Sequence, residues 1–210
     1  MSGLTAFQIE VARLFFGLPA SNGFLLAGGG ALLASGLTDR PTHDLDFFGP
    51  PGHVDVTAAR DQFEQAIADR GWRSERLHDS ATFVRLHVTG DEELIVEFAI
   101  DSAAGRPPVI SIVGPTFDPD ELAGRKLVAL FSRAEARDFA DVYVLAQRFD
   151  RATLLQRAHE VDPGFDRVVL AEMMSTLDRF DDNELPIGSA DVTAVRTFFA
   201  DWARKLATGA

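Results

Sequence analysis

The chain of 210 residues contains no cysteine. Disulfides and thiolate metal sites are therefore excluded, and the composition fits a reducing compartment. No run of apolar residues is long enough to cross a bilayer, so no transmembrane helix is predicted. The first residues lack a basic segment and include Glu10, so no secretory signal is predicted either. These absences together predict a cytoplasmic protein with no membrane partner.

Lysine is nearly absent as well. Lys126 and Lys205 are the two lysines among twenty basic residues, and the others are arginines. The formal net charge is −12, which argues against broad non-specific binding of nucleic acid but leaves room for a local basic groove. A lysine in so arginine-rich a chain suggests a role that needs an ammonium group. For Lys126 the alternative is an exposed lysine whose stem lies along the surface.

The pattern of apolar residues predicts an α+β protein with a soft domain boundary near residue 115. In residues 1–115, helical stripes alternate with strand-like runs, which predicts a mixed sheet with flanking helices. The predicted strands are 24–27, 43–48, 72–77, 82–89, 94–101 and 109–113, and the predicted helices are 5–16, a short one after Gly30, and 56–70. Residues 116–210 are predicted to form a helical domain, with helices from Pro119 and over 137–149, 151–160, 165–180 and 191–206.

Two aspartates alternate with hydrophobic residues in the strand-like segment 43–48. Side chains of a strand point alternately to its two faces, so Asp44 and Asp46 share one face while Leu45 and Phe47 share the other. Two carboxylates about 6–7 Å apart repel each other unless a cation or a proton lies between them. Aspartate is also depleted in ordinary strands. The pair therefore predicts a divalent-cation site, with a solvated edge strand as the alternative.

Three glycines, Gly28, Gly29 and Gly30, separate the apolar run 24–27 from a short apolar segment. This order predicts a buried strand, a tight turn and a short helix, whose free N–H groups and dipole suit a phosphate. Glycines more often serve only the turn, so the motif alone is weak. The Asp44-x-Asp46 pair that follows makes it more specific.

A third carboxylate, Glu97, lies within segment 94–101, which is apolar at nearly every position and is predicted to be a central strand. A carboxylate in the middle of such a strand needs a partner. Two readings stay open. Glu97 is either a third metal ligand or general base, or the partner of an arginine such as Arg85 on the preceding strand.

Downstream, Asp138 and Asp141 are spaced i, i+3 and so share one face of a predicted helix. Asp138 fits an N-terminal cap or a solvated acidic face. Asp141 lies deeper, beside Val142 and Leu145, and is the better functional candidate.

In combination these motifs resemble the AbiEii/AbiGii toxin family, which includes the MenT-type toxins of bacterial toxin–antitoxin systems. The resemblance covers roughly residues 22–148 and is carried by Gly28-Gly29-x-Ala31-Leu32, Arg40-x-Thr42-x-Asp44-Leu45-Asp46-Phe47, Lys126 and Arg137-Asp138-x-x-Asp141. It implies the polymerase-beta-like nucleotidyltransferase fold followed by a helical domain. It also implies Mg²⁺-dependent transfer of a nucleotide from an NTP, with the 3′ end of tRNA as acceptor, a block of translation, and a cognate antitoxin as partner.

The resemblance also implies roles for individual residues. Asp44 and Asp46 become metal ligands, Lys126 becomes a triphosphate contact, and Asp141 becomes the carboxylate that orients Lys126 or the nucleotide. The nucleotide-binding segment comprises Gly28, Gly29, Gly30, Arg40 and Thr42, in which Arg40 touches phosphate or braces the loop. The chain departs from the family at one place. Nucleotidyltransferases usually carry a serine or threonine in the glycine turn, where this chain has Gly29 or Gly30.

The expected chemistry is in-line attack by a hydroxyl on the α-phosphate of an NTP, with pyrophosphate leaving. A first alternative keeps this chemistry with a small-molecule acceptor, such as an aminoglycoside, or a protein hydroxyl. A second alternative is a non-catalytic binding module that has kept the fold. A basic groove formed by Arg125, Arg133, Arg137 and Arg148 would favour RNA.

Overall fold

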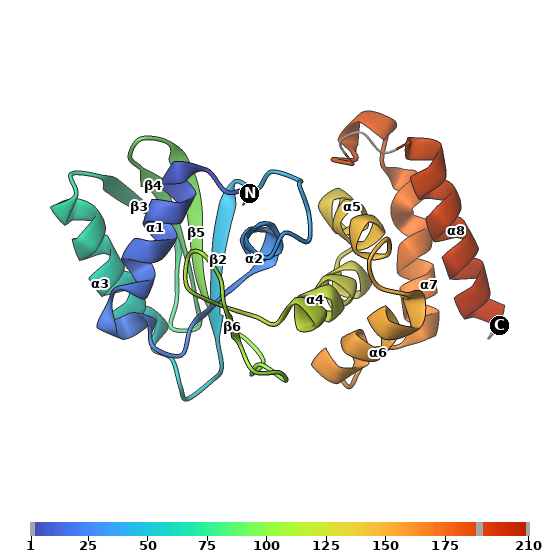
Figure 1. The fold of residues 1–210 in the computed structure, drawn as a ribbon, viewed down its shortest axis with the longest axis horizontal. Coiled ribbons are helices and arrows are strands. Elements are labelled where there is room, and N and C mark those ends of the chain that lie inside the picture. Colours follow the sequence, from blue (N-terminus) through green and yellow to red (C-terminus); the bar gives the residue numbers. More distant parts are fainter. Residues whose placement is uncertain (1–2, 188–190, 209–210) are drawn as a thin grey trace. The chain divides into compact units, whose positions relative to one another are not determined.

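The computed structural model describes residues 3–187 and 191–208, and the chain divides into two compact units after Pro119 (Figure 1). The predicted boundary near residue 115 lies slightly before this division. The first unit contains α1 (Ala6–Phe16), the 3₁₀ turn η1 (Pro19–Ser21), β1 (Leu25–Ala27), α2 (Gly28–Ala34), β2 (Asp44–Gly49), α3 (Val56–Asp69), β3 (Arg73–Asp79), β4 (Phe83–Thr89), β5 (Glu93–Ile100), β6 (Val109–Ile110) and β7 (Pro115–Thr116).

The strands form one sheet in the order β3-β4-β5-β2-β1-β7-β6. The β2–β5 and β1–β7 pairs are parallel, and the other neighbours are antiparallel. The predicted mixed sheet with flanking helices is therefore confirmed. The predicted central position of segment 94–101 is also confirmed, because β5 pairs with β4 on one side and with β2 on the other.

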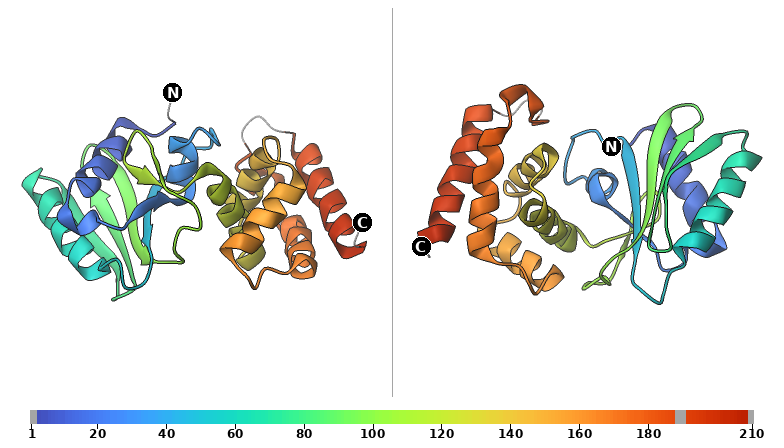
Figure 2. Two further views of the ribbon diagram at one scale, coloured as in Figure 1. Left: turned by 60° about the horizontal axis from the view of Figure 1, so that its bottom comes forward. Right: turned by 180° about the vertical axis from the view of Figure 1, so that it is seen from behind.

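Helices α1 and α3 cover one face of the sheet, and α2 lies on the other (Figures 1 and 2). The covered face is built from phenylalanines: the ring of Phe15 on α1 lies 4.4 Å from that of Phe47 and 4.7 Å from that of Phe98, centre to centre. Phe63 of α3 packs edge-on against Phe98 at 5.4 Å. Because strand side chains alternate, the burial of Phe47 in this core directs Asp46 to the face that carries α2.

Local sequence signals place the ends of the two covering helices. Thr5 accepts a hydrogen bond from the Gln8 N–H, while the Gln8 side chain accepts one from the Thr5 N–H, which is a complete capping box for α1. Asp55 caps α3 with its side chain, which accepts a hydrogen bond from the Ala58 N–H. Gly71 follows the end of α3 with φ +76°, a conformation that glycine adopts without strain.

Two sequence predictions need correction in this unit. The glycines were expected in a turn before a helix, but α2 begins at Gly28, so they form the first turn of the helix itself. The predicted strand 109–113 is also too long, since β6 ends at Ile110. Ser111 then turns the chain through hydrogen bonds of its N–H and hydroxyl to the Gly114 carbonyl, and β7 follows.

The second unit is helical, as predicted. It contains α4 (Pro119–Ser132), α5 (Ala136–Leu145), α6 (Arg151–Val161), α7 (Arg167–Ser175), the 3₁₀ turns η2 (Thr176–Arg179) and η3 (Asp182–Glu184), and α8 (Val192–Thr208). The predicted helix 165–180 is shorter than expected, because its last turn tightens into η2. Helices α7 and α8 run side by side (Figures 1 and 2). No helix of the described ranges is long and apolar enough to span a membrane.

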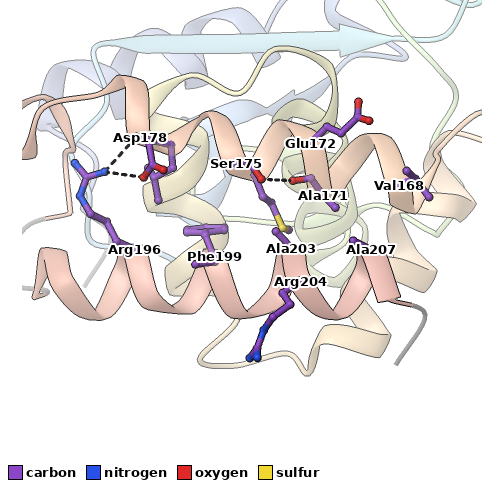
Figure 3. A pocket seen from close by; sticks show the side chains of 13 residues that line it. Val168, Ala171, Glu172, Ser175, Asp178, Arg196, Phe199, Ala203, Arg204 and Ala207 are labelled. Carbon is purple, nitrogen blue, oxygen red and sulfur yellow. Dashed lines mark hydrogen bonds and ion pairs between the residues drawn. The ribbon is translucent and has the colours of Figure 1, made fainter.

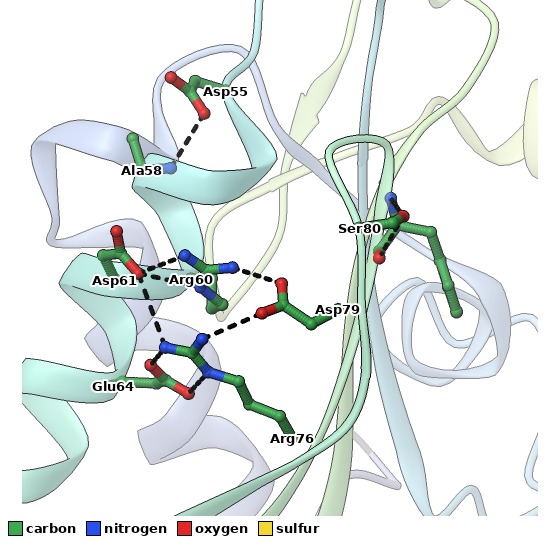
Figure 4. A network of polar contacts seen from close by, with 9 residues as sticks. Asp55, Ala58, Arg60, Asp61, Glu64, Arg76, Asp79 and Ser80 are labelled. Carbon is green, nitrogen blue, oxygen red and sulfur yellow. Dashed lines mark hydrogen bonds and ion pairs between the residues drawn. The ribbon is translucent and has the colours of Figure 1, made fainter.

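Edge strand β3 is tied to α3 by a network of exposed charges (Figure 4). Arg76 donates two hydrogen bonds to the Glu64 carboxylate of α3, from Nε at 2.8 Å and from Nη2 at 2.6 Å. Its Nη1 lies 2.9 Å from Asp79 Oδ2. Arg60 of α3 also pairs with Asp79. The Arg60 hydrogen bond is the largest cause that holds the pKa of Asp79 below its usual value. Such a charged edge discourages pairing with a strand of another chain.

The Asp79 carboxylate is expected to stabilise the fold at neutral pH and to lose this effect in acid. A carboxyl group whose pKa is lowered by folding adds stability above its unfolded pKa of about 4, and the gain disappears as pH falls through the lower folded value. Asp79→Asn should therefore lower the free energy of unfolding at pH 7, and the gap to the wild type should close towards pH 2. Urea unfolding of both proteins at several pH values measures this difference in the free energy of unfolding.

Glu75→Gln is the matched control, since Glu75 lies exposed on the same strand and has no ion-pair partner within the described part of the chain. An equal loss in both variants, or a loss in Asp79→Asn that does not change with pH, would contradict the assignment.

Candidate functional site

The two predicted aspartates lie on β2, and the Asp46 carboxylate lies directly against the backbone of Gly28. A β-carbon built on Gly28 would stand 1.7 Å from Asp46 Oδ2, far inside any real contact. The φ of Gly28 is +60°, which also favours glycine. Asp46 is the register partner of Ala27, the last residue of β1. The strand pairing therefore brings the acidic face of β2 to the start of α2.

The second glycine is covered by the loop that leads into β2. A β-carbon on Gly29 would lie 2.8 Å from the hydroxyl oxygen of Thr42 and 3.5 Å from Arg40 Nη2. Thr42 is only 8% exposed, and its hydroxyl donates a short hydrogen bond to Asp44 Oδ1. The carbonyl of Thr42 accepts a hydrogen bond from the side-chain amide of Gln8 at 2.8 Å, which fixes the loop to α1.

Six of the residues predicted from the sequence are thus brought together within the first unit: Gly28, Gly29, Arg40, Thr42, Asp44 and Asp46. Gly30 serves packing instead, because a β-carbon there would lie 3.0 Å from the side chain of Leu45. The sequence showed a missing hydroxyl in the glycine turn. In the structure the Thr42 hydroxyl fills the space in which a side chain at position 29 would lie.

Glu97 lies on β5 as the register partner of Asp46 on the neighbouring parallel strand. Its carboxylate is bound by Arg85 of β4, with 2.6 Å between Arg85 Nε and Glu97 Oε1. The ion pair between Arg85 and Glu97, which was one of the two interpretations of Glu97 from the sequence, is therefore present. Among the residues that the structure describes, no group of three histidine, cysteine or acidic side chains is arranged to hold a metal ion.

A divalent cation fits the two aspartates without Glu97. Mg²⁺ takes oxygen ligands and is commonly held by one or two carboxylates, with water and substrate phosphates completing its shell. Asp44 and Asp46 supply two carboxylates on one face of one strand. Because Gly28 and Gly29 carry no side chains, oxygen atoms of Asp46 and Thr42, rather than carbon, lie against the start of α2. The donor set matches Mg²⁺ chemistry.

In the second unit, Lys126 and Asp141 form a buried ion pair between α4 and α5. The distance from Lys126 Nζ to Asp141 Oδ2 is 2.8 Å, and Asp138 Oδ1 lies 3.6 Å from the same nitrogen. The Lys126 side chain is 9% exposed and both aspartate side chains are fully buried. The reading of Lys126 as an exposed surface lysine is therefore wrong.

Asp138 does more than the sequence indicated. It caps α5, since its carboxylate accepts a hydrogen bond from the Glu135 N–H at 3.2 Å, so the predicted capping role is confirmed. The solvated-face reading is wrong, because Asp138 is fully buried and Arg133 binds both its oxygens, at 2.9 and 3.0 Å. The only sequence signal for this was its i, i+3 spacing from Asp141.

The turn between α4 and α5 that places Arg133 contains a conformation unusual for a residue with a side chain. Ala134 has φ +47° and is fully buried. Its carbonyl accepts a hydrogen bond from Arg179 Nη2 at 2.6 Å, which stabilises the turn from η2. Three segments of the second unit therefore converge on the network that holds Lys126.

The basic groove predicted from four arginines is largely neutralised. Arg125 lies 2.9 Å from Glu121, and Arg137 lies 2.8 Å from Glu135, while Arg133 binds Asp138 as described. Each of these three guanidinium groups is thus offset by a carboxylate, which weakens its attraction for phosphate.

A cavity of about 450 Å³ lies between α7 and α8 (Figure 3). Its wall is mostly apolar and small, with Ala171, Ala203 and Ala207 along it, and Arg196 and Asp178 pair near one end. None of the predicted site residues lines it. The cavity is therefore distinct from the residues that carry the predicted chemistry.

Comparison with known proteins connects these residues to a family. A family model described as nucleotidyl transferase AbiEii toxin, type IV TA system, matches residues 13–197. No curated protein sequence matches the chain significantly.

Solved structures share the fold at low sequence identity. A putative nucleotidyltransferase from Helicobacter pylori has a TM-score of 0.58 and 19% identity over 98% of this chain and 97% of its own. JHP933 from Helicobacter pylori has a TM-score of 0.57 and 19% identity over 99% and 92%. MenT4, a nucleotidyltransferase toxin from Mycobacterium tuberculosis, has a TM-score of 0.54 and 16% identity over 96% and 85%. The predicted nucleotidyltransferase fold is confirmed.

The close contact between Gly28 and Asp46 predicts that Gly28→Ala is more damaging than the same change at another glycine of similar backbone conformation. Gly36 has φ +63° and would have no atom within 4 Å of a β-carbon, so Gly36→Ala should cost only the strain of this φ, about 1–2 kcal/mol. Gly28→Ala should cost about 1–3 kcal/mol more, because Asp46 must move. Urea unfolding of both variants tests this, and equal losses would refute the contact.

The buried pair of Lys126 and Asp141 predicts a strong non-additive effect on stability. Lys126→Met leaves Asp141 buried without its ammonium partner and should cost about 3–5 kcal/mol. Adding Asp141→Leu should restore most of the loss, because replacing both partners removes the uncompensated charge. Chemical denaturation of the single and double variants measures the coupling. Losses that simply add would show that the two side chains are not a pair in solution.

Proposed function

The chain belongs to the AbiEii nucleotidyl transferase toxin family of type IV toxin–antitoxin systems, and on this premise we propose that it transfers a nucleotide from an NTP to the 3′ end of tRNA. The resemblance predicted from the motifs is thereby confirmed. One observation carries the proposal: the paired carboxylates of Asp44 and Asp46 lie at the first turn of α2, with Thr42 and Arg40 over Gly29.

In the proposed reaction, the terminal hydroxyl of the acceptor attacks the α-phosphorus of the NTP. A new bond forms between phosphorus and the acceptor oxygen, and the bond from the α-phosphorus to the bridging oxygen breaks, so pyrophosphate leaves. The hydroxyl proton passes to solvent or to a nearby carboxylate. Asp44 and Asp46 would hold Mg²⁺, which when bound offsets charge on the phosphate oxygens.

Thr42 and Arg40 are proposed to contact the phosphates. The Thr42 hydroxyl lies beside Gly29, so it is proposed to supply at this place the hydroxyl that the glycine segment lacks, by turning towards a phosphate oxygen the single hydrogen that it donates to Asp44 in this structure. The guanidinium of Arg40 approaches the same glycine and suits phosphate oxygens. Glycines Gly28 to Gly30 are proposed to let the nucleotide approach the backbone closely.

Lys126 is proposed as a further triphosphate contact, with Asp141 as the residue that positions its ammonium group. The 2.8 Å pair supports this, because a buried lysine held by a carboxylate has a fixed direction. Glu97 is proposed to add negative charge beside Asp46, partly offset by Arg85. The protein is further proposed to act in the cytoplasm, to block translation through the modified tRNA, and to be silenced by a cognate antitoxin.

Incubation with total tRNA, Mg²⁺ and each of the four labelled NTPs should label tRNA with at least one nucleotide. Asp44→Ala/Asp46→Ala should lose transfer, because no carboxylate pair remains for the cation. Thr42→Val keeps the shape of the side chain but removes its hydroxyl, and it should lower the rate about 10²-fold. Thr42→Ser, which keeps the hydroxyl, is the matched control and should retain most of the activity.

The outcomes separate the parts of the proposal. Absence of label from tRNA under every condition would exclude the tRNA acceptor, and label on a small-molecule or protein hydroxyl instead would identify a different acceptor. Equal transfer by the double aspartate variant would exclude the metal assignment. A rate for Thr42→Val equal to that of Thr42→Ser would exclude the hydroxyl contact.

A further inference from the structure

Three cations surround one carboxylate near the end of α8. Asp201 lies 2.9 Å from Arg151 Nη1, 2.7 Å from Arg204 Nη2 and 3.0 Å from Lys205 Nζ. These hydrogen bonds, that of Arg151 first, hold the pKa of Asp201 well below its usual range, so the carboxylate stays ionised. The group, here called the Asp201 cluster, therefore contains two more positive charges than negative ones.

The Arg151 end of the cluster is held by aromatic rings. Its guanidinium lies 4.6 Å from the ring centre of Phe198 and 5.3 Å from that of Trp202, both on α8. Trp202 is buried and gives a rigid support. The nearest acidic residue in the sequence, Asp150, accepts a hydrogen bond from the Thr153 N–H and caps α6. Arg151 is therefore fixed in place before any ligand arrives.

The cluster's other cations are exposed: the side chain of Arg204 is 73% accessible and that of Lys205 53%. Figure 3 shows Arg204 pointing away from α7. Lys205 is also the second of the two lysines in the chain. Both charged groups can therefore reach a partner in solvent without unfolding the helix.

The other ion-pair groups within residues 3–187 and 191–208 have no such excess. Carboxylates are at least as many as cations around Arg60 and Arg76, around Arg157, and around Arg196. The same holds for three arginines of the predicted basic groove. In a chain of net charge −12, a local excess of two positive charges on an exposed surface marks a place where a polyanion is attracted rather than repelled.

We propose that the Asp201 cluster binds the phosphate backbone of the RNA acceptor. The inference rests on the proposed function, which requires an RNA substrate, and it adds a surface that holds this substrate by its phosphates. Arg204 and Lys205 on α8, together with Arg151 of α6, suit successive phosphates, which recur at regular spacing along a strand. An acidic protein segment would present carboxylates less regularly and is the competing partner.

Binding of fluorescein-labelled tRNA, followed by anisotropy without NTP between 50 and 200 mM salt, tests the proposal. Arg204→Ala/Lys205→Ala removes two positive charges at exposed positions, so folding should be unaffected, which a thermal melt checks. Binding at about 100 mM salt should weaken about tenfold or more, and the slope of log affinity against log salt should become shallower by about 1–2.

The control is Arg73→Glu, which changes the net charge by the same amount at an exposed site on β3 in the first unit. It should leave binding and the salt slope nearly unchanged. Equal weakening by both variants would show a general charge effect and overturn the proposal, as would unchanged binding in the double variant. Displacement of tRNA by poly-glutamate at the same charge concentration would also overturn the proposal, because the surface would then not prefer RNA over an acidic polypeptide.

The outcome of this binding test is independent of the outcome of the labelling experiment that tests the proposed function. Cluster-dependent binding of tRNA without transfer of label would remove the proposed reaction and keep the RNA surface. Transfer of label to tRNA with unchanged binding by Arg204→Ala/Lys205→Ala would keep the reaction and remove the surface.

Discussion

In the first unit, the carboxylate of Asp46 occupies the space in which a β-carbon at position 28 would stand. This contact requires glycine at the junction of β1 and α2, and it brings the first turn of α2 onto the acidic face of β2. The phenylalanine core on the opposite face fixes the direction of that strand, because Phe47 cannot leave the core without turning Asp46 with it. Packing on one face therefore determines where the carboxylates lie on the other.

The second unit differs in that charged side chains are buried in its interior. Two aspartates that are fully buried would be costly alone, and they are compensated by Lys126 and by the fork of Arg133. The network spans α4, the turn at Ala134 and α5, so its members depend on one another. Such a network gives the Lys126 ammonium a fixed direction, and stability and positioning have the same origin here.

The sequence predicted those features that depend on local periodicity. Alternation in a strand placed Asp44 and Asp46 on one face, and helical spacing placed Asp138 and Asp141 together. It could not predict contacts made across the fold. That Thr42 covers Gly29, and that Arg133 buries Asp138, depends on where a loop and a turn return to the structure. For the same reason both interpretations of Glu97 stayed open, and the sequence did not show that carboxylates neutralise the arginines of the predicted basic groove.

The relation between positions 29 and 42 shows how the loop takes the space that a side chain on the glycine segment would need. A side chain at position 29 and the Thr42 side chain would compete for one space, since their nearest atoms would be 2.8 Å apart. A hydroxyl can therefore come from the helix or from the loop, but the two positions do not accommodate both without a shift. In this chain glycine at position 29 leaves the space to Thr42, whose hydrogen bond to Asp44 directs the hydroxyl towards the carboxylates. Glycine at position 29, which looks like a loss in the motif, is what gives the loop around Thr42 the space for this arrangement.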